Sequence, residues 1–241
     1  MRPENTVEAF RYARETGAHG VELDVHVCAS GEVVVFHDEK VERLTDGEGR
    51  LETMTLGELR ELRVRGPRPP DMPESGLPEP TSSRIPILEE VIETLGPEML
   101  IDIELKGRAG KPDGLESKLL RLVRRMGAGD RVIYTSFNPV RLLRLRRHGW
   151  SLPLGMLFYH GNPRWIRDRW TEPLVQPKLL APFHENIGIE MMRDAARDDL
   201  SVWTWTVNRP EDARRVAKLG VRAIITDDPA KLLALDLKAG T

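Results

Sequence analysis

Apolar residues recur along the chain with two different periods, and these periods predict helices and strands in alternation. Helical spacing of the apolar positions predicts eight helices. They are expected at residues 6–16, 55–63, 87–95, 115–126, 139–148, 189–197, 210–219 and 229–236. Short apolar runs between them predict strands. These runs are 20–26, 33–36, 100–105, 131–136, 153–158, 174–177, 201–207 and 222–226. Such alternation is typical of βαβ units with a parallel sheet.

Several helix starts carry capping residues. Asn5 or Thr6 can cap the first helix. The stretches NPVRLL and NRPEDA place a proline just after Asn138 and Asn208, which predicts capped helices there. Asp228 precedes a proline in TDDP and is expected to cap the last helix.

One pair of strands must form a hairpin, because only CASGE separates residues 22–27 from 33–37. A parallel crossover needs about a dozen residues. The other seven strands can lie parallel, one fewer than in a TIM (β/α)8 barrel. We therefore expect an α/β fold, a TIM (β/α)8-type barrel lacking its first strand in this chain, with that strand preceding residue 1. Residues 1–241 are expected to form a single barrel domain.

Two segments are expected to be loops. Residues 64–86 hold seven prolines, which favours a loop or short insertion. Residues 106–114 form another loop, directly after a predicted strand.

Composition and charge limit the partners and the cellular compartment that the sequence favours. The formal net charge is -2 and the pI about 6.3, so no overall field attracts nucleic acid or a membrane surface. The single cysteine, Cys28, excludes a disulfide within the chain and favours a reducing, cytoplasmic setting. No run approaches the roughly 20 apolar residues of a membrane-spanning helix, and no stable membrane association is expected.

Polar residues on the predicted hairpin are candidates for chemistry. Side chains two apart on a strand share a face, so Glu22, Asp24 and His26 point the same way. A turn centred on the SG pair of CASGE would place His37 opposite Asp24 and Val35 opposite His26. A register one residue different would turn His37 away.

A second strand carries charges in the same pattern. In LIDIELKGR, Asp102, Glu104 and Lys106 alternate with apolar residues, as expected of a strand between helices and a barrel interior. Barrel enzymes keep their active sites at the carboxyl ends of such strands. The same alternation is also typical of a strand facing solvent.

Glu22, Asp24 and Glu104 are candidate metal ligands. Three close carboxylates cannot all stay ionised in a dry site without a counter-charge. Mg2+ or Ca2+ would supply it, whereas zinc prefers cysteine and histidine ligands. Lys106 would then offer a point charge to a phosphate oxygen. With His37 as a proton donor, the site predicts phosphate ester cleavage. The ordinary alternative for His37 is a satisfied structural histidine.

The motifs PENT, ELDV, FHD, IELK, WTVN and ITDDP occur in this order. With them the sequence closely resembles the glycerophosphodiester phosphodiesterase family, over nearly the whole chain except the proline-rich segment and residues around 160–185. The resemblance implies a TIM barrel that hydrolyses glycerophosphodiesters to glycerol 3-phosphate and an alcohol with a divalent cation, in glycerophospholipid metabolism.

The resemblance also assigns roles to particular residues. It implies Glu22 and Asp24 as metal ligands from the ELD motif, with Glu104 as the third. It implies Lys106 for phosphate binding and His37 as general acid or base. Two further residues, Phe137 and Trp205, match positions that line the family's substrate pocket. For Trp205, packing in the core is the alternative.

One departure leaves alternatives open. The family begins with a strand ending in His-Arg-Gly, which supplies a second catalytic histidine and a phosphate-binding arginine, whereas this chain starts at MRPENT. We expect the natural protein to extend upstream of Met1. The alternatives are an N-terminally incomplete, non-catalytic phosphodiester-binding barrel, or a related lipid phosphodiesterase that forms a cyclic phosphate.

Overall fold

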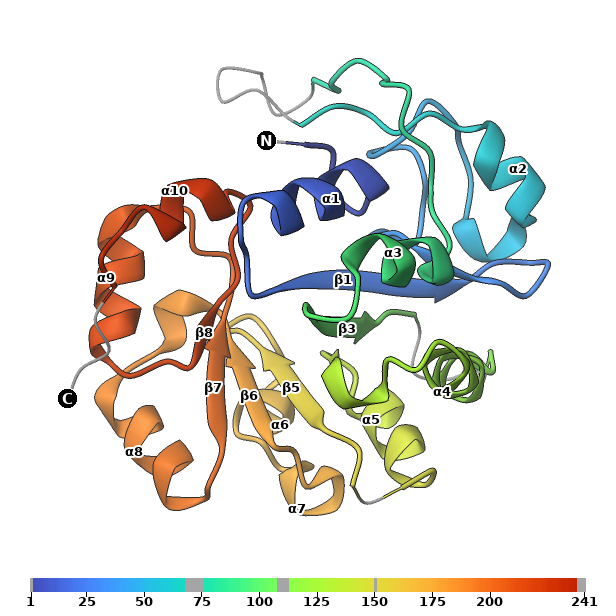
Figure 1. Cartoon of the computed structure of the whole chain (residues 1–241). Helices are drawn as coiled ribbons and strands as arrows, with labels where there is room; N and C mark the ends of the chain where they lie inside the picture. Colours follow the sequence, from blue (N-terminus) through green and yellow to red (C-terminus); the bar gives the residue numbers. More distant parts are fainter. Residues whose placement is uncertain (1, 68–75, 108–112, 150, 238–241) are drawn as a thin grey trace. The chain divides into compact units, whose positions relative to one another are not determined.

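The computed structural model of the chain describes residues 2–67, 76–107, 113–149 and 151–237 (Figure 1). Its internal contacts group into two compact units, Met1–Val132 and Ile133–Thr241. The single barrel domain expected from the sequence stays a prediction. Parts of both expected loops, at 68–75 and 108–112, lie outside the described residues.

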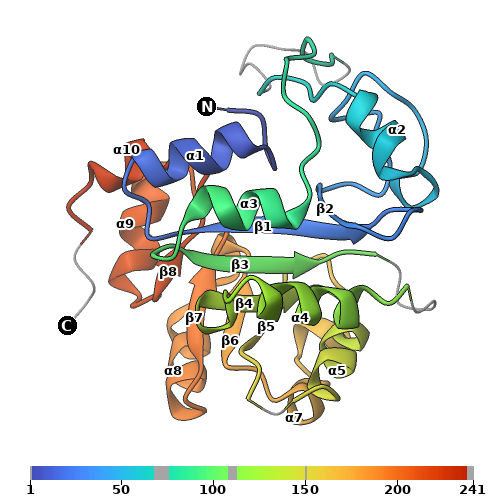
Figure 2. The same ribbon diagram turned by 45° about the vertical axis from the view of Figure 1, so that its right-hand side comes forward.

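The first unit is built around three neighbouring strands. Its elements are α1 (Val7–Glu15), β1 (Gly20–Val27), β2 (Val33–Val35), η1 (Leu51–Thr53), α2 (Leu56–Glu61), α3 (Leu88–Leu95), β3 (Leu100–Leu105), α4 (Leu115–Arg125) and η2 (Gly129–Arg131). β1 lies in the middle, antiparallel to β2 and parallel to β3. Figure 2 shows α1 and α3 side by side along β1.

The hairpin of β1 and β2 forms as predicted, but its expected register is wrong by one residue. His26 pairs with Val34 rather than with Val35. The N–H of Phe36 donates to the carbonyl of Asp24 at 2.9 Å, so Phe36 takes the position across from Asp24 that His37 was expected to hold. His37 lies two residues beyond the end of β2 and is not part of the ladder.

The length of the turn explains the shift in register. The N–H of Cys28 donates to the carbonyl of Glu32 at 3.1 Å, and the N–H of Gly31 donates back to Cys28 at 3.0 Å. The loop therefore has three residues instead of two, and Gly31 has a φ of 101°. Three-residue hairpin loops place a left-handed residue at their third position, which glycine tolerates best.

The described residues of the second unit form five strands. Its elements are β4 (Val132–Ser136), α5 (Pro139–Arg146), β5 (Leu154–Phe158), α6 (Arg164–Arg167), α7 (Glu172–Val175), β6 (Leu179–Pro182), η3 (His184–Asn186), α8 (Ile189–Arg197), β7 (Ser201–Thr204), α9 (Pro210–Lys218), β8 (Ala223–Ile224) and α10 (Pro229–Leu233). Each strand pairs in parallel with the next one along the chain. Figure 1 shows β5, β6 and β7 side by side and pointing the same way.

One strand was predicted at the wrong place. The apolar pair at 174–175 belongs to helix α7, and the strand between β5 and β7 is β6. Pro173 lies in the first turn of α7, where its missing N–H leaves no helical bond unmade, and Gln176 ends the helix with a φ of 49°. A run this short has no periodicity that separates helix from strand.

The caps follow the sequence with one exception. Asn138 accepts from the N–H of Val140 at 3.0 Å, and Asp228 caps α10 by accepting from Lys231. Asn208 does not cap α9, whose N-cap is Arg209. The side chain of Asn208 accepts instead from the N–H of Asp227 at 3.0 Å. Among the described residues, no helix combines the length and apolar character that crossing a membrane requires.

Candidate active site

Three carboxylates meet where β1 and β3 lie side by side. One oxygen each of Glu22, Asp24 and Glu104 lies within 4.8 Å of the others. The parallel register explains the meeting, because it pairs Asp24 with Glu104, and Glu22 lies two residues earlier on the same face. Asp24 and Glu104 are only 3% and 6% exposed. The alternative of a strand facing solvent is therefore wrong.

Lys106 supplies a positive charge to two of these carboxylates. Its Nζ lies 3.0 Å from Oδ1 of Asp24 and 2.9 Å from Oε1 of Glu104. Burial alone would lower the pKa of Lys106, but the two carboxylates outweigh it and raise that pKa. Lys106 is therefore a charged ammonium at neutral pH.

The carboxylates themselves are hard to ionise together. Burial raises the pKa of Glu22 well above its ordinary value of 4.5, and the charges of Asp24 and Asp102 add to the rise. Burial also raises the pKa of Glu104 to about 7, although Lys106 acts in the opposite direction. A further positive charge beside the two glutamates would lower their pKa values and favour their ionised forms.

The arrangement fits a hard divalent cation. Carboxylate oxygens are the ligands that Mg2+ and Ca2+ prefer, and two oxygens on opposite sides of Ca2+ lie about 5 Å apart. The three ligand oxygens here lie within 4.8 Å of one another. When all three groups are ionised, the ammonium of Lys106 leaves two negative charges, which one divalent cation would neutralise.

Asn5 fixes one of the three carboxylates. Its Nδ2 donates to Oδ2 of Asp24 at 2.8 Å, and its Oδ1 accepts from the backbone N–H of Asp24 at 3.3 Å. Asn5 has a φ of 55°, in the left-handed region that asparagine enters more readily than most residues. Thr6, the next residue, caps α1. From the sequence, Asn5 was predicted only as a possible helix cap.

His37 lies close enough to this group to respond to its charge. Its side chain is 48% exposed, and its Nδ1 lies 2.5 Å from Oδ1 of Asp38. Hydrogen bonding to Asp38 raises the pKa of His37 against the effect of burial, and the charge of Asp24 adds to the rise. The expected reason for this proximity, a cross-strand pair with Asp24, is wrong.

Residues next to His37 form a network that the sequence analysis missed. Arg43 binds both oxygens of Asp38, with Nε 2.6 Å from Oδ2 and Nη2 2.7 Å from Oδ1. Nη2 also lies 3.1 Å from Oε1 of Glu4. The only signal in the sequence is the HD pair itself, followed five residues later by an arginine.

His26 shares a strand face with the carboxylates, as predicted, but it is buried. Burial lowers the pKa of His26, although a hydrogen bond to the carbonyl of His37 acts in the opposite direction. Its Nε2 lies 3.3 Å from that carbonyl oxygen. His26 therefore contacts the backbone of His37 and helps to hold it in place.

Comparison with known proteins identifies the chain. The model of the glycerophosphoryl diester phosphodiesterase family matches residues 1–231. The chain belongs to this family. It is 36% identical to a glycerophosphodiester phosphodiesterase of Caldanaerobacter subterraneus, over 99% of this chain and 94% of the relative. The enzyme class predicted from the sequence, a glycerophosphodiester phosphodiesterase, is confirmed.

Solved structures confirm the predicted fold class of a TIM-barrel-type phosphodiesterase. The glycerophosphodiester phosphodiesterase of Thermotoga maritima is 25% identical, with a TM-score of 0.72 over 95% of this chain and 91% of that one. A phosphodiesterase of Oleispira antarctica, solved with the product sn-glycerol-3-phosphate, has a TM-score of 0.83. It is 23% identical and covers 97% of this chain and 91% of that one, so the likeness concerns the fold.

The two aromatic residues that the resemblance to phosphodiesterases implied lie together in the second unit. The rings of Phe137 and Trp205 are 5.3 Å apart at 86°. Tyr159 packs against Phe137 at 6.1 Å and Phe183 against Trp205 at 5.4 Å. Each of the four directly follows the last residue of its strand, in β4, β5, β6 and β7. Tyr159 and Phe183 were not predicted from the sequence.

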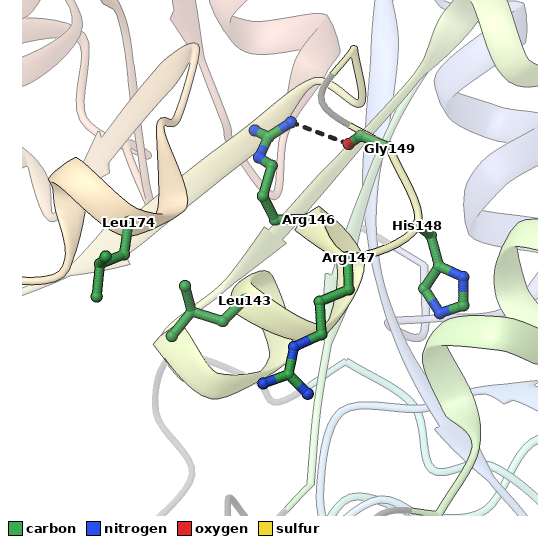
Figure 3. A pocket seen from close by; sticks show the side chains of 6 residues that line it. All are labelled: Leu143, Arg146, Arg147, His148, Gly149 and Leu174. Carbon is green, nitrogen blue, oxygen red and sulfur yellow. Dashed lines mark hydrogen bonds between the residues drawn. The ribbon is translucent and has the colours of Figure 1, made fainter.

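The second unit also has a surface pocket of about 450 Å³ (Figure 3). Its lining residues are Leu143, Arg146, Arg147, His148, Gly149 and Leu174. The guanidinium of Arg146 is turned toward the carbonyl of Gly149 and also donates to the carbonyls of Val175 and Gln176. These hydrogen bonds join the end of α5 to the segment that follows it and to the end of α7. None of the predicted site residues lines the pocket.

Proposed function

We propose that the enzyme hydrolyses glycerophosphodiesters to glycerol 3-phosphate and an alcohol with a divalent cation, Mg2+ or Ca2+, held by Glu22, Asp24 and Glu104. The observation that carries the proposal is the meeting of these three carboxylates, two of them buried, beside Lys106. Such a cation would offset the negative charge of the phosphate and polarise its oxygens. The products would feed glycerophospholipid metabolism.

Lys106 and His37 provide the other two functions that the reaction needs. The ammonium of Lys106 is fully charged and would contact a phosphate oxygen once the carboxylates have another counter-charge. The imidazole of His37 is partly exposed and holds its proton more firmly than an ordinary histidine. It is therefore suited to protonate the leaving alcohol.

The chemical step is a hydrolysis with balanced protons. The oxygen of a water molecule bonds to phosphorus, and the bond between phosphorus and the leaving alcohol oxygen breaks. That oxygen takes a proton from Nε2 of His37. Over one turnover, a proton released by the attacking water restores the imidazolium.

A small-molecule substrate is supported by the relatives. The Oleispira antarctica phosphodiesterase was solved with sn-glycerol-3-phosphate, which is the product proposed here. Phe137 and Trp205 are assigned to substrate binding, since partly exposed aromatic rings at the carboxyl ends of parallel strands are suited to hold the apolar carbons of a substrate.

Product analysis with glycerophosphocholine tests the proposed reaction. We expect glycerol 3-phosphate and choline in equal amounts. Glycerol with phosphocholine, or a cyclic glycerol phosphate, would contradict the assignment of the bond that breaks. Lack of any product with Mg2+ or Ca2+ present would instead favour a phosphodiester-binding protein.

The leaving group tests the role of His37. A general acid matters less when the leaving group is itself acidic. His37→Ala should therefore lower kcat strongly with glycerophosphocholine and much less with the p-nitrophenyl ester of glycerol 3-phosphate. Equal losses with both substrates would contradict a role in protonating the alcohol. His148→Ala, in the second unit, is the matched control.

A further inference from the structure

We propose that Arg43 is a positioning residue for phosphodiester hydrolysis. It holds the carboxylate of Asp38 in the orientation in which that carboxylate accepts the Nδ1–H of His37, and it thereby directs Nε2 of His37 to the substrate. This inference rests on the role proposed for His37 and adds a residue that acts through it.

The contacts of Asp38 define its orientation from two sides. Arg43 donates to both carboxylate oxygens, at 2.6 Å and 2.7 Å, and a guanidinium that binds in this way holds a carboxylate in its own plane. Oδ1, one of those two oxygens, also lies 2.5 Å from Nδ1 of His37. The imidazole and the guanidinium therefore share one oxygen of Asp38, and their nitrogens Nδ1 and Nη2 lie 3.4 Å apart.

The charge state of Asp38 agrees with this arrangement. Burial alone would raise the pKa of Asp38, but the hydrogen bonds from Arg43 and His37 outweigh it and lower that pKa strongly. Asp38 is therefore an ionised acceptor throughout the neutral range. An ionised acceptor at Nδ1 favours the tautomer with hydrogen on Nδ1, which leaves Nε2 to exchange protons. A carboxylate orients the catalytic histidine of serine proteases in the same way.

Glu4 extends the network to the turn before α1. Its Oε1 lies 3.1 Å from Nη2 of Arg43, and the next residue, Asn5, holds Asp24. The same short turn therefore contacts both the histidine network and the carboxylate group. The Arg43 side chain is half exposed, and ion pairs with such exposure contribute little to stability. Stability alone does not account for three hydrogen bonds of Arg43 beside a candidate general acid.

Kinetics of Arg43 variants in the full chain with glycerophosphocholine test the inference. We expect Arg43→Ala to lower kcat by about 10- to 100-fold, with little change in KM, because the imidazole loses its orientation while the phosphate contacts remain. Arg43→Lys keeps the charge but cannot bind both oxygens, so it should restore only a small part of the rate. Arg43→Gln gives the same comparison if the alanine variant does not fold.

Arg50 offers a matched control. It also joins two carboxylates, at 3.0 Å from Glu39 and 3.0 Å from Glu52, in the same unit. Arg50→Ala should leave kcat within about twofold of the unaltered enzyme. A loss like that of Arg43→Ala would show that any arginine network supports the fold here, and would overturn the inference.

Two further measurements separate this inference from the proposed function. In a His37→Ala background, Arg43→Ala should cause no additional loss, because residues that act as a unit are not additive. Nitrogen NMR of His37 should show the Nδ1–H tautomer in the unaltered enzyme and less of it in Arg43→Ala. Full activity of His37→Ala would overturn the proposed role of His37. A large loss in His37→Ala with none in Arg43→Ala would overturn only the role of Arg43.

Discussion

Asp24 shows how much of the site depends on single side chains. One of its oxygens accepts from Asn5 and the other is paired with Lys106, while its backbone carbonyl accepts from Phe36. Asp24 is therefore held in place before any cation binds. Preorganised ligands of this kind bind metals more tightly, because less ordering accompanies binding.

Asn5→Gly should weaken cation binding by about tenfold. Residues that hydrogen-bond to metal ligands typically contribute about 10- to 100-fold to metal affinity. Glycine accepts the φ of 55°, so the change removes the amide without adding strain. Calorimetric titration with Mg2+ or Ca2+ measures the affinity. Asp199→Gly is the control, since Asp199 has a φ of 53° and lies in the other unit. Equal affinity in both variants would show that the amide contributes nothing.

The acidity of Glu104 predicts a pH dependence. Its pKa is about 7 in the folded, cation-free chain and near 4.5 when unperturbed, so the folded chain holds this proton more firmly than the unfolded chain. Stability without cation should therefore fall as the pH rises from about 4.5 to about 7. Cation affinity should rise over the same range, with proton release on binding. Titrations at several pH values in buffers of different ionisation heat would detect the protons. Affinity independent of pH would contradict a protonated Glu104.

At the scale of elements, the sequence predicted the hairpin but not its register. The five letters CASGE show that a tight turn is needed, and they do not show whether two or three residues form it. That choice depends on Gly31 taking a positive φ, which becomes visible only when the strands are paired. The acidic group was predictable for a different reason. Period-two alternation places Glu22 and Asp24 on one face of β1 whatever the register of the hairpin, and the parallel register of β1 with β3 adds Glu104.

Gly31 should be a sensitive position in this hairpin. Alanine there would adopt a φ of 101°, and its Cβ would lie 2.7 Å from Nζ of Lys118, which donates to the Gly31 carbonyl. Gly31→Ala should destabilise the fold by about 1–3 kcal/mol in denaturant unfolding. Gly129→Ala, at a position without positive φ or close neighbours, should change stability by less than about 1 kcal/mol. Similar losses in both would contradict strain at Gly31.

The four aromatic residues are recognised as a group only when the ends of their strands are known. Tyr159 and Phe183 were not recognised, although each follows its strand as Phe137 and Trp205 do. The strand β6 had been expected five residues too early, so Phe183 did not stand at a predicted strand end. Correct boundaries would have revealed one aromatic residue after each of four successive strands.

For the molecule as a whole, ordered motifs carried more information than periodicity. PENT, ELDV, FHD and IELK together carry the resemblance to the family, and residues of these motifs contact one another around Asp24 in the structure. The contacts of Arg43 depend on the path of a loop, and no local pattern predicts that path. The sequence therefore indicated the enzyme class and the three carboxylates that meet in the structure, but not the contacts of Arg43 with Asp38 and Glu4.

The proposed function depends most on one cation bound by three carboxylates. Calorimetric titration of the metal-free enzyme with Mg2+ and with Ca2+, together with hydrolysis of glycerophosphocholine in the same samples, tests it most directly. We predict one bound cation per chain, activity that rises with occupancy, and loss of both in Glu104→Gln, which keeps the shape of the side chain. Full hydrolysis without any bound cation, or unchanged binding in Glu104→Gln, would contradict the account.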